Sequence, residues 1–169
     1  MAKNKFIIIF AGAPGSSRTP IAYYLSWKIG LPILNNDGIR TEVVEDLGVF
    51  NEEEYIKRRN ARIEEVIGGG ISFIYDASVD REWQNWKGRI EKSGYEVFIV
   101  SLNLSRELLA RLYETKGYGE FSLGIDKFIE DHNSFIKQYG NEIRLNISDQ
   151  DFNVRLEKSY EAVTGWLNK

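Results

Sequence analysis

The sequence predicts one three-layer α/β/α domain built around a five-stranded parallel sheet. The chain has 169 residues, which suits a single domain with a full core. Residues 6–10 are an unbroken apolar run, typical of a central strand that is covered on both faces. Strand-like and helix-like segments then alternate to the end, and this alternation predicts parallel strands joined by right-handed crossovers.

Each strand is expected where a short run rich in β-branched or aromatic residues lies between turn residues. The five predicted strands are residues 6–10, 31–35, 71–75, 95–102 and 142–147.

Each helix is expected where apolar residues recur at helical spacing, and most end at a glycine. Gly30, Gly68, Gly94 and Gly117 lie at such ends, and Ser105 is a predicted N-cap. The predicted helices are residues 19–29, 37–47, 51–67, 80–93, 105–115, 125–139 and 151–167.

Composition excludes several classes of protein. There is no cysteine, which rules out disulfide scaffolds and thiolate metal sites and favours a reducing, cytoplasmic setting. The net charge of −3 argues against broad nucleic-acid binding, which needs a basic surface. No segment approaches the roughly 18 apolar residues of a membrane span.

The connection between the first strand and the first helix resembles a phosphate-binding loop of the pattern G-x-x-x-x-G-K-[ST]. In such a loop, backbone N–H groups hold the phosphates, the lysine reaches the β- and γ-phosphates, and the hydroxyl binds Mg²⁺. The loop here reads Gly12, Ala13, Pro14, Gly15, Ser16, Ser17, Arg18 and Thr19. An ordinary strand-to-helix turn is the alternative, since Gly, Pro and Ser are common turn residues.

Three positions depart from that pattern. Ser17 replaces the second glycine, and Arg18 replaces the lysine with a wider, planar cation. Pro20 follows Thr19 and lacks the N–H that this position usually offers to the α-phosphate. These departures predict weaker nucleotide binding or slightly shifted phosphates.

Together with three later segments, the loop resembles the small P-loop kinases, in particular the group containing polynucleotide kinase, zeta toxins and chloramphenicol phosphotransferase. Asp37 and Arg40 match a D-x-x-R element after the second strand. Asp76 ends an apolar strand as in a Walker B element. Arg111 and Lys116 lie where the arginines of a lid, about residues 111–124, would be. The resemblance covers most of the chain and implies a P-loop NTPase fold.

This resemblance also implies roles. Asp37 would be the general base on an acceptor hydroxyl, with Arg40 contacting the acceptor or its phosphate. Thr19 and Asp76 would hold Mg²⁺, and Arg18 and the lid cations Arg111 and Lys116 would surround the phosphates of ATP. Loop residues 12–19 would bind the nucleotide, while the acceptor itself stays unidentified.

Structural alternatives exist for the same residues. Asp37 could instead be a helix N-cap after Asn35-Asn36. Asp76 could end its strand or cap a turn with Ser78, and Arg111 could be a solvated helix residue.

Other polar and aromatic groups favour structural roles. Lys57, Arg58, Arg59 and Arg62 follow three glutamates, a pattern typical of a solvated helix face with i,i+4 pairs such as Glu54–Arg58. His132, in a polar stretch, is expected at the surface. Trp83 and Trp86 are expected to pack on the sheet, and the group Tyr23, Tyr24 and Trp27 in the core.

The sequence therefore predicts a Mg²⁺- and ATP-dependent phosphotransferase acting on a hydroxyl of a small molecule, nucleoside or nucleic-acid end. The alternative is a catalytically impaired pseudokinase that binds nucleotide or acts as a scaffold, favoured by Ser17, Arg18 and Pro20. NTP hydrolysis coupled to a partner protein is a third, weaker hypothesis, since no second domain or partner-facing apolar helix is visible.

Overall fold

Five parallel strands form one sheet in the order β2-β3-β1-β4-β5 in a computed structural model, which describes residues 4–169. The first strand is central, and its side chains are all buried. The strands are β1 (Phe6–Ala11), β2 (Ile33–Asn35), β3 (Phe73–Ser78), β4 (Glu96–Leu102) and β5 (Ile143–Ile147). The predicted three-layer α/β fold with a parallel five-stranded sheet is confirmed.

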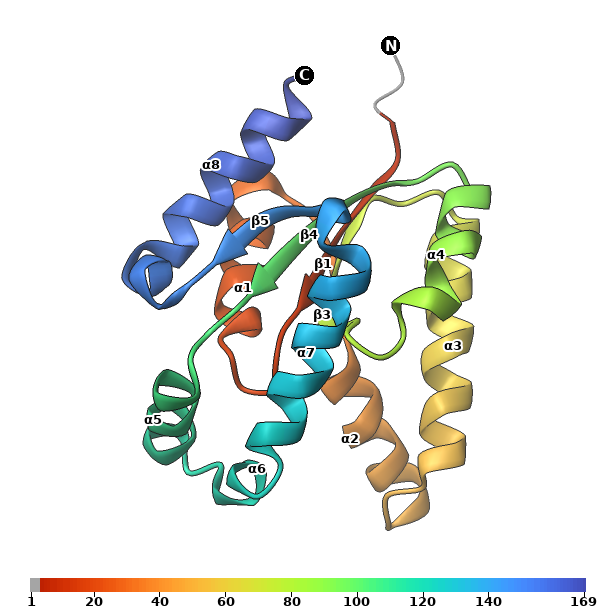
Figure 1. Cartoon of the computed structure of the whole chain (residues 1–169). Coiled ribbons are helices and arrows are strands. Elements are labelled where there is room, and N and C mark those ends of the chain that lie inside the picture. The colour runs from red at the N-terminus through yellow and green to blue at the C-terminus, as the bar shows by residue number, and fades with distance from the viewer. Residues whose placement is uncertain (1–3) are drawn as a thin grey trace.

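Helices cover both faces of this sheet (Figure 1). One face packs against α1 and α8, and the other packs against α3, α4 and α7. The helices are α1 (Arg18–Ile29), α2 (Asn36–Leu47), α3 (Glu52–Gly68), α4 (Trp83–Lys92), α5 (Arg106–Lys116), α6 (Gly119–Ser122), α7 (Ile125–Tyr139) and α8 (Arg155–Leu167). Two 3₁₀ turns, Gly140–Glu142 and Asp149–Val154, flank β5.

The helix pair α2–α3 and the segment α5–α6 both extend beyond the carboxyl ends of the strands (Figure 1). The pair has a small core of its own, formed by Ile39, Val43 and Tyr55. Ligands of open parallel sheets bind at the carboxyl ends of the strands, at the point beside β1 where the strand order reverses. Within residues 4–169, no helix is long and apolar enough to cross a membrane.

The third strand begins and ends later than expected. It runs to Ser78 because the pairing with β1 shifts between Ile9 and Phe10, and Val79 N–H still donates to Phe10 O at 2.9 Å. Asp76 is therefore inside the strand and beside Asn35 of β2, rather than at the strand's end.

Two of the aromatic residues expected in the core lie at the surface. Tyr23 is 59% exposed and Trp27 is 76% exposed. They are four residues apart on α1, whereas the buried face of this helix is formed by Ile21, Ala22 and Leu25. Trp83 is buried against the sheet and Trp86 packs beside it, as predicted.

Candidate active site

The phosphate-binding loop begins at the carboxyl end of the central strand β1 and packs closely against the end of β4 and against α5. Gly12 has φ +145°, and a Cβ there would lie 3.0 Å from the carbonyl oxygen of Leu102. Gly15 has φ +71°, and a Cβ there would lie 2.8 Å from the ring of Tyr113. Both positions require glycine, since a side chain would meet either backbone or a buried ring.

Ser17 adopts the left-handed conformation that the motif normally assigns to glycine. Its φ is +84°, and it is the one non-glycine residue with positive φ in the described part of the chain. Such a conformation costs about 1–2 kcal/mol for an L-residue. The Ser17 hydroxyl does not cap α1 but accepts a hydrogen bond from Arg155 Nε at 2.7 Å.

Thr19 and Asp76 meet at the start of α1. The Thr19 hydroxyl donates to Asp76 Oδ2 at 2.8 Å, and the Asn35 amide donates to the same oxygen at 2.9 Å. Burial raises the pKa of the Asp76 carboxyl, while the Thr19 hydrogen bond and the charge of Arg18 act against that shift. A hydroxyl and a carboxylate are hard oxygen donors of the kind that Mg²⁺ accepts beside water and phosphate oxygens.

Arg18 lies at the position of the motif's lysine and carries an unsatisfied donor. Its Nη1 is buried and has no hydrogen-bond partner. Burial lowers the pKa of its guanidinium, which the charges of Asp76, Asp80 and Asp37 partly offset. A buried donor without a partner is rare in native proteins and indicates a ligand atom or water at that place.

A buried chain of hydrogen bonds supports the loop from the far side. Asp80 accepts from Gly12 N–H at 3.1 Å, and its Oδ1 lies 3.0 Å from His132 Nδ1. His132 Nε2 lies 3.0 Å from the Ser101 hydroxyl. Because a carboxylate only accepts, Nδ1 carries a proton, and in the neutral imidazole Nε2 then accepts from the Ser101 hydroxyl. Ser101 is fully buried, so this chain is a support and not an accessible nucleophile.

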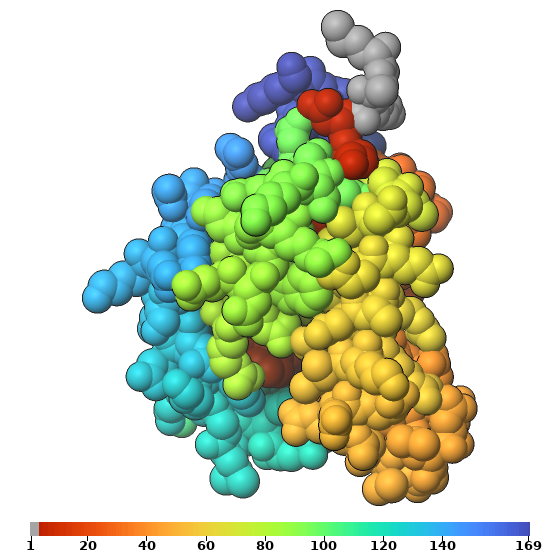
Figure 2. Space-filling model, turned by 90° about the vertical axis from the view of Figure 1, so that its right-hand side faces the viewer, coloured from red at the N-terminus to blue at the C-terminus, as the bar shows by residue number. Residues whose placement is uncertain are grey.

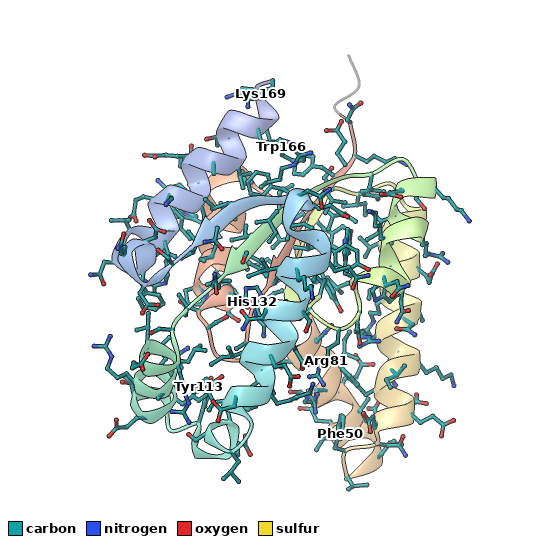
Figure 3. All side chains as sticks on the ribbon, in the orientation of Figure 1. Phe50, Arg81, Tyr113, His132, Trp166 and Lys169 are labelled. Carbon is teal, nitrogen blue, oxygen red and sulfur yellow. The ribbon has the colours of Figure 1, made fainter. Side chains whose placement is uncertain are left out.

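The expected surface position of His132 is thus wrong. His132 lies on the sheet-facing side of α7 (Figure 3) and is 4% exposed. The misleading signal was its polar neighbours, Asp131 and Asn133. The informative signal was the spacing, because Ile125, His132 and Phe135 share one face of the helix and are all buried.

The segment containing α5 contacts the loop directly. The Tyr113 hydroxyl donates to Pro14 O at 2.7 Å, and Lys116 Nζ donates to Gly15 O at 2.6 Å. Burial lowers the pKa of Lys116, and the charges of Arg155 and Arg18 lower it further. Figure 3 shows Tyr113 on α5. Arg111 is on the same helix, but its side chain is exposed and does not line the cleft described next.

A cleft of about 990 Å³ opens above the loop. The loop forms its floor, α2 and α3 line one side, and residues of α6 and α7 line the other. Figure 2 shows the hollow between these segments, with N-terminal residues in dark red at its bottom.

Asp37 lines this cleft from the first turn of α2. The N-cap of α2 is Asn35, whose side chain accepts from Asp37 N–H at 2.7 Å. The alternative in which Asp37 is itself the cap is therefore wrong. Its exposed carboxylate makes no hydrogen bond or ion pair within the described residues.

Arg40 lines the same wall one turn further along. Its guanidinium lies 4.4 Å from the ring centre of Phe50 and 4.9 Å from that of Tyr55. Cation–π contacts of this kind hold an arginine in place without using its N–H donors. Phe50 is at the turn between α2 and α3 (Figure 3).

The basic cluster on α3 is largely paired, as predicted. Arg58 Nε donates to Glu54 at 2.8 Å, which confirms the expected i,i+4 pair, and Nη1 donates to Glu42 and Asp46 of α2. Arg59 differs, because it lines the cleft and donates to Glu82 at 2.9 Å.

Several residues of the site were not indicated by the sequence. Asp80 and Arg155 contact the loop from the β3–α4 connection and the start of α8, and His132 of α7 contacts Asp80, all far from the motif in sequence. Asn35 was visible only as the residue before Asp37. No local pattern distinguishes Arg155 from other helical arginines.

Known structures share this fold. The APS kinase CysC of Mycobacterium tuberculosis, solved with AMPPNP and APS, matches with a TM-score of 0.64 at 15% identity, over 95% of this chain and 98% of that one. A sugar kinase from Janibacter sp. HTCC2649 matches with a TM-score of 0.63 at 17% identity, over 97% and 95%. The shikimate kinase of Bacteroides thetaiotaomicron matches with a TM-score of 0.59 at 13% identity, over 97% and 99%.

The fold is that of the small P-loop kinases. At these identities the likeness concerns the P-loop kinase fold and not the substrate. No protein-family model matches the sequence, and no curated protein matches it.

Proposed function

We propose that this chain is a phosphotransferase that moves the γ-phosphate of Mg·ATP to a hydroxyl group of a small molecule, nucleoside or nucleic-acid end. The observation that carries the proposal is the geometry of the cleft. The Thr19–Asp76 contact and the loop lie on its floor, and the unengaged carboxylate of Asp37 lies on its wall. The P-loop kinase fold of the structural neighbours supports the same class of reaction.

In this reaction the loop N–H groups and the N-terminus of α1 would hold the phosphates. Thr19 and Asp76 would hold Mg²⁺, which neutralises charge on the phosphate oxygens. The acceptor oxygen would attack the γ-phosphorus while Asp37 takes the hydroxyl proton, and ADP would leave.

Cations on both sides of the cleft would stabilise the charge of the transferring group. Arg18 lies beneath it, and Arg40 lies on the acceptor wall. Residues 111–124 would act as a lid that excludes water, bringing Arg111 and Lys116 to the phosphates. The acceptor would resemble those of polynucleotide kinase, zeta toxin or chloramphenicol phosphotransferase in being an alcohol.

A second candidate is a nucleotide-binding pseudokinase. The observations that favour it are the left-handed Ser17, the arginine at position 18 and the missing N–H of Pro20. All three affect the loop and none affects Asp37.

Two experiments separate these proposals. In thermal melting, Mg·ATP at about 100 times its dissociation constant should add roughly 2.7 kcal/mol, or roughly 5–10 °C. An absent shift would contradict nucleotide binding and both proposals with it.

In an acceptor screen for ADP release, Asp37→Asn should abolish transfer and keep the ATP-induced melting shift. Glu45→Gln, an exposed carboxylate on the same helix outside the cleft, is the matched control. ATP binding without any transfer, in a broad screen, favours the pseudokinase. Retained turnover in Asp37→Asn would remove Asp37 from the role of base.

A further inference from the structure

Three cations lie around the phosphate-binding loop without any carboxylate partner within residues 4–169. Lys116 donates to the Gly15 carbonyl, Arg155 donates to the Ser17 hydroxyl, and Arg18 has a buried free donor. Burial lowers the pKa of Lys116, and the charges of Arg155 and Arg18 lower it further. Arg18 and Arg155 are half-buried and Lys116 is exposed. Neighbouring cations that lack a counter-charge mark a site for an anion.

Arg155 is the unexpected member of this group, because it begins α8 and is 138 residues from its partner in the loop. Its guanidinium is held by three contacts. Nε donates to Ser17 Oγ at 2.7 Å, Nη1 donates to Phe152 O at 2.8 Å, and the group lies 4.2 Å from the Phe152 ring centre. These contacts leave Nη2 free, so the group is positioned and still has N–H donors to offer.

The loop lacks a backbone donor in the first turn of α1, the helix whose N-cap is Ser17. Pro20 is in the first turn of α1 and has no N–H, whereas a phosphate-binding loop normally presents one there to the α-phosphate. A guanidinium can replace a backbone donor well, because it is always charged and binds phosphate oxygens through its planar fork.

We propose that Arg155 is a phosphate-binding residue of the nucleotide site, supplied by α8 and positioned by the hydroxyl of Ser17. Its ligand would be the polyphosphate chain of a nucleoside triphosphate, and the inference rests on the proposed nucleotide site. This role explains why Ser17 occupies a position where glycine is expected. The Ser17 hydroxyl positions Arg155, and Arg155 replaces the N–H donor that Pro20 lacks.

The test measures dissociation constants by calorimetry for Mg·ATP and for Mg·tripolyphosphate, which has the phosphate chain but no base or ribose. Arg155→Ala should weaken both ligands about 10- to 100-fold. Arg155→Lys, which keeps the charge, should recover part of the loss. Arg144→Ala, an exposed arginine on β5 with no hydrogen bond to the loop within residues 4–169, is the matched control and should bind like the wild type.

Arg155→Gln separates ligand binding from support of the loop. Its amide can still donate to Ser17 but carries no charge. Its melting temperature without ligand should therefore stay close to that of the wild type while both affinities fall. A purely structural arginine would give the reverse, with lower stability and unchanged affinity in the folded protein.

Three outcomes would overturn the inference. Equal affinities of wild type, Arg155→Ala and Arg155→Gln would show that Arg155 does not touch the ligand. Weaker ATP binding with unchanged tripolyphosphate binding would place Arg155 at the base or ribose. A wild-type protein that binds neither ligand would overturn the proposed nucleotide site, and this inference with it.

Discussion

The α2–α3 pair and the phosphate-binding loop differ in how their basic side chains are paired. On the α2–α3 side, Arg58 contacts three carboxylates, Arg62 contacts Glu42, and Arg59 contacts Glu82. Around the loop, Lys116 and Arg155 contact carbonyl or hydroxyl oxygens, and Arg18 Nη1 has no hydrogen-bond partner within residues 4–169.

The presence or absence of a carboxylate partner separates cations that stabilise the fold from cations that are available to bind a ligand. A surface arginine in an ion pair stabilises the folded protein modestly, and its charge is already neutralised by the paired carboxylate. An unpaired, half-buried cation such as Arg18 or Arg155 destabilises the folded protein until an anion binds to it. Arg40 is intermediate, since it stacks on Phe50 and Tyr55 and keeps its donors free.

The largest effect is expected at Arg18, where stability and binding should move in opposite directions. Arg18→Met removes a buried cation with a free donor, so the melting temperature without ligand should stay the same or rise. Affinity for Mg·ATP should fall about 100-fold. Calorimetry and melting curves on the same protein check both.

Arg18→Lys sharpens this result. It restores the compact ammonium of the usual motif and should raise affinity or turnover above the wild type. An unchanged or lower value would mean that the arginine is adapted to this loop. Loss of stability in Arg18→Met would break the comparison between the α2–α3 pair and the loop.

The Asp80 carboxylate, which accepts from the Gly12 N–H of the loop, gives the second test. His132→Leu leaves Asp80 and Ser101 without their imidazole partner in a buried place. We expect a loss of about 1–3 kcal/mol, seen as a drop of roughly 2–12 °C in melting temperature. His132→Asn keeps a donor near the position of Nδ1 and should lose less. Equal losses would mean that the volume of the ring matters, and not its hydrogen bonds.

Arg58 should show the opposite behaviour to Arg18. Arg58→Met breaks the contacts to Glu54, Glu42 and Asp46, so the melting temperature should fall by a few degrees, and less in high salt. Affinity for Mg·ATP should not change. Lys57→Met, which affects a single exposed pair at 3.7 Å, is the control and should have little effect. Weaker nucleotide binding in Arg58→Met would place this side in the ligand site.

The smallest effect concerns Asp151, in the 3₁₀ turn that precedes Arg155. Lys158 and the hydroxyl and N–H of Ser148 lower its pKa from 3.8 to about 2. A lowered pKa in the folded state stabilises the protein above pH 4, and this contribution is lost as the pH falls from about 4 to about 2. Asp151→Asn should therefore melt earlier than the wild type at pH 7, with the difference closing toward pH 2.

Glu161→Gln, an exposed carboxylate on α8, is the control for that titration. Its melting temperature should follow the wild type at every pH. A melting-temperature difference between Asp151→Asn and the wild type that stays constant from pH 7 to pH 2 would show that the lowered pKa of Asp151 is not its cause.

Features with a local period were predictable from the sequence. The parallel sheet follows from apolar runs of strand length between helical segments, and the loop follows from its glycine spacing. Asp37 and Asp76 were singled out because each lies near the carboxyl end of a strand, where parallel sheets gather polar groups. The roles of these residues remain predictions, but the structure places both of them at one cleft.

The errors came from judging single residues by their neighbours. Tyr23 and Trp27 were assigned to the core as aromatic residues, but the face of α1 that packs on the sheet excludes them. His132 was assigned to the surface because polar residues flank it, although its spacing from Ile125 and Phe135 puts it on the buried side.

The sequence by itself determined the architecture, the loop and its three departures, because each is encoded in consecutive or periodic residues. Only the tertiary structure decided what surrounds the loop. Asp80, His132 and Arg155 come from three separate elements, and the Arg155–Ser17 contact spans 138 positions. Whether a cation pairs with a carboxylate or remains available to a ligand depends on which elements the fold brings together. No local sequence pattern encodes these long-range contacts.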